Sequence, residues 1–98
     1  MLLAHALTLA EARSYVAALA DNALTTDASI EYDRVLLQID FIHGDLIPAI
    51  APVPVTDRDV LFGVAESAIE DLVEHGIDGL TVELVLDMLH AAHALDTR

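Results

Sequence analysis

The segment from residue 56 to residue 95 constrains the fold most, because its apolar residues recur at helical spacing on both sides of one short turn. Residues three and four apart share a helix face. The inward positions are Leu61, Val64, Ala65, Ala68 and Leu72 before the turn, and Val85, Met88, Leu89, Ala92 and Leu95 after it. Gly76 suits the left-handed position that ends a helix. The segment predicts two packed helices, over residues 57–75 and 81–95.

The N-terminal half predicts two more helices. Thr8-Leu9-Ala10-Glu11 matches a capping box, which places the start of a helix over residues 8–24 and leaves residues 1–7 as a leader. A second apolar pattern covers residues 28–47, and Pro48 lacks the backbone donor needed to continue it. Four helices with short connections predict one all-α domain over residues 1–98, a small antiparallel (up-down) bundle.

Charge and composition narrow the possible partners. Seventeen Asp and Glu residues face four Lys and Arg residues, a net charge of −13 at pH 7. Such a field repels nucleic acid and anionic membranes and favours a basic protein partner. The 55% hydrophobic content excludes intrinsic disorder. The absence of cysteine excludes disulfides and thiolate sites and agrees with a cytoplasmic location.

The sequence offers little machinery for catalysis. There is no cysteine, and none of the three serines lies in a nucleophile-elbow motif. No phosphate-binding loop or dinucleotide fingerprint is present. We therefore expect a protein that is not an enzyme and needs no cofactor.

A metal site is the main alternative. Residues 40–43 and 87–90 both match Asp-x-x-His, similar in spacing to the Glu-x-x-His motifs of di-metal bundles. His93 adds a possible surface ligand for zinc. Turning Asp87 and His90 inward would expose large apolar side chains, at about 1.5–3 kcal/mol each. A metal carrier or metalloenzyme would use Asp40, His43, Asp87, His90 and His93.

Further apolar residues lie beside the inward-facing rows of the two middle helices, which we call the seams, and they predict an interface. They form one stripe on each middle helix: Ile30, Leu37 and Phe41, then Phe62, Ile69 and Val73. A bundle this small has difficulty burying both the seams and the stripes, and exposed apolar patches usually mark interfaces. We predict a two-fold homodimer. In the alternative, the leader and the Pro-Val connector cover both stripes within one chain.

An acidic ridge completes the hypothesis. It comprises Glu66, Glu70, Asp71 and Glu74, which recur along the outer face of the helix over residues 57–75. The sequence favours a small acidic interaction module that binds a basic protein, as an inhibitor, an immunity or antitoxin-like protein, or a regulatory partner. A further alternative is a structural or assembly subunit of a larger complex.

Overall fold

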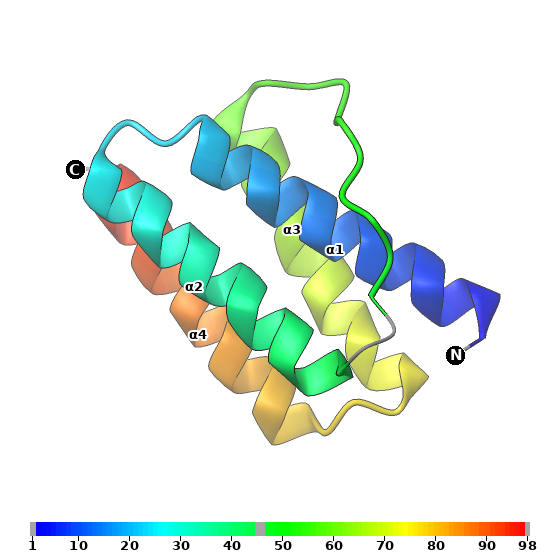
Figure 1. Cartoon of the computed structure of the whole chain (residues 1–98). Coiled ribbons are helices and arrows are strands. Elements are labelled where there is room, and N and C mark those ends of the chain that lie inside the picture. The colour runs from blue at the N-terminus through cyan, green and yellow to red at the C-terminus, as the bar shows by residue number, and fades with distance from the viewer. Residues whose placement is uncertain (1, 45–46, 98) are drawn as a thin grey trace.

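The computed structural model describes residues 2–44 and 47–97, which form a bundle of four helices (Figure 1). The helices are α1 (Leu3–Asp21), α2 (Thr26–His43), α3 (Arg58–Asp71) and α4 (Gly79–Asp96), and a 3₁₀ turn, η1 (Leu72–His75), extends α3. No strand occurs in these two ranges. The predicted all-α bundle is confirmed.

The helices form a closed ring in which every contacting pair is antiparallel. Helices α1 and α4 each pack against both α2 and α3, so α1 lies diagonal to α4 and α2 lies diagonal to α3. Helices α2 and α3 nevertheless run in the same direction, because the connector between them returns along the bundle before α3 begins (Figure 1). The chain therefore runs up, down, down and up.

The N-terminal end of α1 differs from the prediction. The helix begins at Leu3 instead of Thr8, so the predicted leader over residues 1–7 is wrong from Leu3 onward. The Thr8 hydroxyl does not cap the helix, and its Oγ1 lies 3.3 Å from Nε2 of His75. Leucine and alanine, which dominate residues 2–7, are strong helix formers, and no Gly or Pro interrupts them.

The other helix ends follow local capping chemistry. Thr25 accepts a hydrogen bond from the Ala28 amide at 3.1 Å, which places the start of α2 slightly before the predicted residue 28. Helix α2 ends at His43 and does not continue to residue 47, because Gly44 adopts φ +70°. At the end of η1, Gly76 has φ +93°, and the Ile77 amide donates to the Leu72 carbonyl at 3.2 Å.

The remaining caps are aspartates. The Asp57 side chain accepts from the amides of Asp59 and Val60 at the start of α3. The Asp78 side chain accepts from the Thr81 amide, so α4 begins at Gly79 instead of residue 81. The negative charge of these side chains also interacts favourably with the positive N-terminal ends of the helix dipoles.

The core lies between the four helices and draws on all of them. Its largest fully buried apolar side chains are Leu9, Val16, Leu19, Tyr32, Val35, Ile39, Leu61, Ile69, Val85 and Leu89. Burial of each side chain this large contributes roughly 1.5–3 kcal/mol. In the part of the chain that the structure describes, no helix is long and apolar enough to cross a membrane.

An arginine on α1 holds the connector in place. Arg13 makes a two-pronged ion pair with Asp40, with Nε 2.7 Å from Oδ1 and Nη2 3.1 Å from Oδ2. Its Nη1 also donates to the Pro48 carbonyl. One residue later, the Ser14 hydroxyl accepts from the Ala51 amide at 3.0 Å. These largely buried contacts fix the end of α2 and the connector against α1.

Candidate functional site

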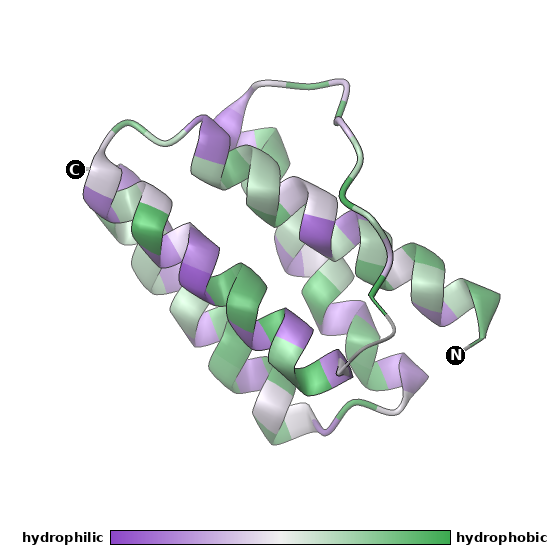
Figure 2. Ribbon diagram, in the orientation of Figure 1, coloured by the Kyte–Doolittle hydropathy of each residue, from purple (hydrophilic) through white to green (hydrophobic). Residues whose placement is uncertain are grey.

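The predicted apolar stripe on α2 lies at the surface. The side chains of Phe41 and Leu37 are 82% and 67% exposed, and Ile30 is also exposed. Leu37 and Phe41 are four residues apart, so they are neighbours on the helix surface. Figure 2 shows hydrophobic positions on the side of α2 that faces the viewer as well as toward the core.

A shallow groove runs beside this stripe, between α2 and α4. Its volume is about 840 Å³, and it is lined by Arg34, Leu37, Gln38, Asp40, Phe41, Gly44 and Met88. Exposed Leu84 and Leu80 lie one and two turns before Met88 on α4, which extends the apolar edge. We call Leu37, Phe41, Leu80, Leu84 and Met88 the α2–α4 surface.

The stripe predicted on α3 is wrong as a surface feature. Ile69 is fully buried in the core, because α3 packs against both α1 and α4 and therefore buries a wide arc. Phe62 is half-buried and stacks on the His93 ring, with centroids 4.0 Å apart and planes inclined by 17°. Among the three residues, only Val73 is exposed.

The predicted acidic ridge lies along α3 and η1. Glu70, Asp71 and Glu74 are exposed, and Oε2 of Glu66 lies 2.5 Å from Nε2 of His90 across the α3–α4 contact. Glu83 and Asp87 are exposed on α4, so the negatively charged surface includes this helix as well. One side of the α2–α4 surface is therefore flanked by carboxylates.

Each arginine in the described residues is paired with a carboxylate. Arg13 binds Asp40. Arg34 Nη1 lies 3.3 Å from Glu31, and Arg58 Nη1 lies 3.8 Å from Asp96. The carboxylates that remain set the sign of the surface potential, which attracts cationic groups.

The structure does not bring the predicted metal ligands together. Asp40 is bound by Arg13, His90 contacts Glu66, His93 stacks on Phe62, and Asp87 is exposed on α4. Across residues 2–44 and 47–97, no group of three or more His, Cys, Asp or Glu side chains is arranged to hold a metal ion. The predicted set of five ligands is not assembled.

His43 instead belongs to a histidine cluster that the sequence analysis missed. Its ring meets His5 from α1, and the His5 ring stacks on His75 from η1 with centroids 5.1 Å apart. Burial lowers the pKa of His5, and positive charge on either neighbouring imidazole lowers it further. His5 falls within residues 1–7, which the sequence predicts as a leader outside the helix, so its position on α1 is not predicted.

A buried carboxylate at the opposite end of the bundle was also missed. Asp96 is 1% exposed, and its Oδ1 accepts from the Leu24 amide at 2.8 Å. Its Oδ2 accepts from the Tyr32 hydroxyl at 3.2 Å, and Arg58 lies within ion-pair distance. The sequence does contain a signal for its burial: Asp96 lies seven residues, or two helical turns, after Leu89 and therefore on the inward face of α4.

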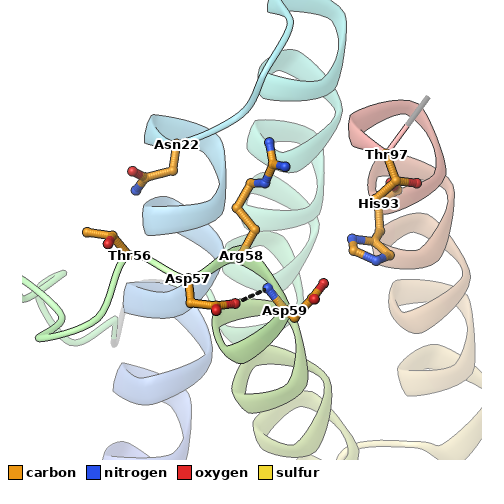
Figure 3. Close-up of a pocket in the computed structure, with 7 residues that line it drawn as sticks. All are labelled: Asn22, Thr56, Asp57, Arg58, Asp59, His93 and Thr97. Carbon is orange, nitrogen blue, oxygen red and sulfur yellow. Dashed lines mark hydrogen bonds between the residues drawn. The ribbon is translucent and has the colours of Figure 1, made fainter.

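A polar pocket of about 430 Å³ lies beside this carboxylate (Figure 3). It is lined by Asn22, Thr56, Asp57, Arg58, Asp59, His93 and Thr97. His93 points from α4 toward the first turn of α3, and its buried Nδ1 has no hydrogen-bond partner. Arg58 lies between Asp57 and Asp59 in the sequence, and both carboxylates line this pocket with it. We assign the pocket no reaction.

The buried tyrosine predicts a loss of stability at alkaline pH. Burial, followed by the charge of Asp96, raises the pKa of Tyr32 well above its usual value of 10. Above about pH 10 the unfolded chain releases the phenolic proton while the folded chain keeps it, so stability present below that pH is lost as the pH rises. Urea unfolding across this range measures the loss. Tyr32→Phe should remove this component, whereas Tyr15→Phe should keep it, and an unchanged loss in Tyr32→Phe would contradict the assignment.

The chain was also compared with known proteins. No family model, curated protein or solved structure matches it. Function is therefore argued from the surface itself, where the α2–α4 surface combines exposed large apolar side chains with a groove and an acidic flank.

Proposed function

We propose that this chain is a non-enzymatic protein-interaction module whose α2–α4 surface docks a basic, amphipathic helix of a partner protein. The observation that carries the proposal is the exposure of Phe41 and Leu37 beside a groove of about 840 Å³. Leaving an aromatic ring and a leucine in water forfeits burial energy in the isolated chain. Contiguous patches of this kind usually mark interaction sites.

The spacing of the exposed residues favours a helical partner. Leu37 and Phe41 on α2 line the groove with Met88 on α4. Exposed Leu84 and Leu80 precede Met88 at one-turn spacing along α4. A partner helix placed between these residues of α2 and α4 contributes apolar residues at i, i+3, i+4 and i+7. The proposed mode is therefore a helix lying in a groove.

Charge favours a basic partner. The chain carries a net charge of −13, and each described arginine is already paired. Lysines or arginines on the outer face of a docked helix would approach Glu83 and Asp87. The exposed ridge residues Glu70, Asp71 and Glu74 would increase the association rate by attracting the partner from a distance.

A designed peptide tests the site. The probe is a fluorescent, leucine- and lysine-containing amphipathic helix, with binding followed by anisotropy. Phe41→Asp should weaken binding about 30-fold, the loss typical of a hot-spot aromatic. Val60→Asp adds the same charge at an exposed position in the first turn of α3 and is the matched control. An added carboxylate alone should not weaken binding of a cationic peptide. Equal weakening in both variants would therefore mean that the loss is not specific to Phe41 and would overturn the proposed site.

A homodimer through the same surface is the second candidate. The stripe of Ile30, Leu37 and Phe41 extends over much of α2 and can pair with its own copy about a two-fold axis. Repulsion between two chains of charge −13 opposes this pairing. Sedimentation equilibrium decides: a dimer that Phe41→Asp dissociates supports self-association, and a monomeric wild-type chain rejects it.

The proposed setting is the cytoplasm, on the ground that the chain has no cysteine.

A further inference from the structure

Three of the five histidines converge at one end of the bundle, although they come from three separate elements. His5 lies in the first turns of α1, His43 is the last residue of α2, and His75 is the last residue of η1. All three are half-buried, so solvent reaches them while the surrounding helices restrict their rings. None of these three histidines belongs to the α2–α4 surface. His43 is one of the five predicted metal ligands, whereas His5 and His75 are not.

The hydrogen bond of His43 fixes which of its nitrogens is free. Nδ1 lies 2.7 Å from the Ile39 carbonyl, which can only accept, so Nδ1 carries a proton. In the neutral ring, Nε2 is therefore unprotonated and directs its lone pair toward His5. Metal-bound histidines typically donate from their other ring nitrogen to a carbonyl or carboxylate in this way.

The two facing nitrogens have a spacing suited to one metal ion. Nε2 of His5 lies 3.1 Å from Nε2 of His43. With zinc–nitrogen bonds of about 2.0–2.1 Å, two ligands on a tetrahedral ion are about 3.3 Å apart. A shift of a few tenths of an ångström would replace the hydrogen bond by a bridging ion. His5 would move its proton from Nε2 to Nδ1, with no net proton release.

The polarity of two helix ends also favours a cation at this end. His43 and His75 lie at the C-terminal ends of α2 and η1, where unpaired carbonyls carry partial negative charge. The −13 chain adds an attractive field. We propose that His5 and His43 form a two-histidine binding site for a zinc-class divalent transition metal, open to water at its other coordination positions. His75 stacks on His5 and orients its ring.

The test uses untagged, chelator-treated protein at neutral pH, titrated with zinc by calorimetry. We expect one ion per chain, a rise in Tm with zinc, and shifts in the ring ¹⁵N resonances of His5 and His43. His5→Ala and His43→Gln should each weaken zinc binding about tenfold or more. Loss of a residue that merely hydrogen-bonds to a metal ligand already costs about 10–100-fold in affinity, so loss of a ligand should cost at least as much. The double variant with His90→Ala and His93→Ala is the control and should bind as the wild type does.

Two results would overturn the proposal. One is the absence of saturable zinc binding by the folded wild-type chain. The other is zinc binding that His5→Ala leaves unchanged, since this would place the ion on surface carboxylates. Circular dichroism of each variant confirms that it is folded, and the ¹⁵N shifts of the wild-type rings test ligation without any substitution.

Discussion

Replacing Asp96 by alanine is expected to lower the free energy of unfolding by about 3–5 kcal/mol, a range typical of breaking a buried charged network. The substitution removes the acceptor for the Leu24 amide and for the Tyr32 hydroxyl, and it leaves Arg58 without its carboxylate. A buried donor without a partner costs about 1–3 kcal/mol. Urea unfolding followed by circular dichroism measures the change.

A matched substitution on the same helix provides the control. Asp87→Ala removes an exposed carboxylate from α4 and should change stability by less than about 0.5 kcal/mol. Asp96→Asn retains an acceptor oxygen for the Leu24 amide and should fall between the two. If Asp96→Ala were as stable as Asp87→Ala, the carboxylate would not link α4 to α2 and the loop before it.

Ile69→Ala is expected to destabilise the fold by about 2–5 kcal/mol, because it leaves a cavity at a fully buried position. Val73→Ala, one turn later and exposed, should cost less than about 1 kcal/mol. Thermal unfolding of both variants gives the comparison. An Ile69→Ala chain of native stability but altered self-association would restore Ile69 to an interface stripe and contradict its place in the core.

The all-α architecture follows from the sequence because helical periodicity is a local property. The seams over residues 57–75 and 81–95, and the stop at Gly76, appear in the structure close to their predicted positions. The capping-box pattern at Thr8 was misleading, since that threonine contacts His75. The parallel course of α2 and α3 depends on how the connector packs along α1, which no local pattern encodes.

The sequence predicts that apolar stripes exist on the candidate surface, but it does not predict which of them stay exposed. Ile30, Leu37 and Phe41 form a stripe on any straight helix, but whether a stripe is covered depends on which side of the helix its neighbours pack against. Helices α2 and α3 have the same two neighbours, α1 and α4, yet Ile69 lies on the covered side of α3 and Phe41 on the exposed side of α2. The contact between His5 and His43 forms because the first turn of α1 lies beside the last turn of antiparallel α2. The predicted leader over residues 1–7 leaves His5 outside any helix, so the sequence does not predict this contact.

The most direct measurement of the proposed function is an NMR titration of the isotope-labelled chain with the basic amphipathic peptide. We expect the largest shifts in the side-chain resonances of Leu37, Phe41, Leu84 and Met88, with smaller changes at Glu83 and Asp87. Core residues of α1, such as Val16, should change little. Shifts confined to α1 and α3, or spread evenly over all the acidic residues, would contradict docking on the α2–α4 surface.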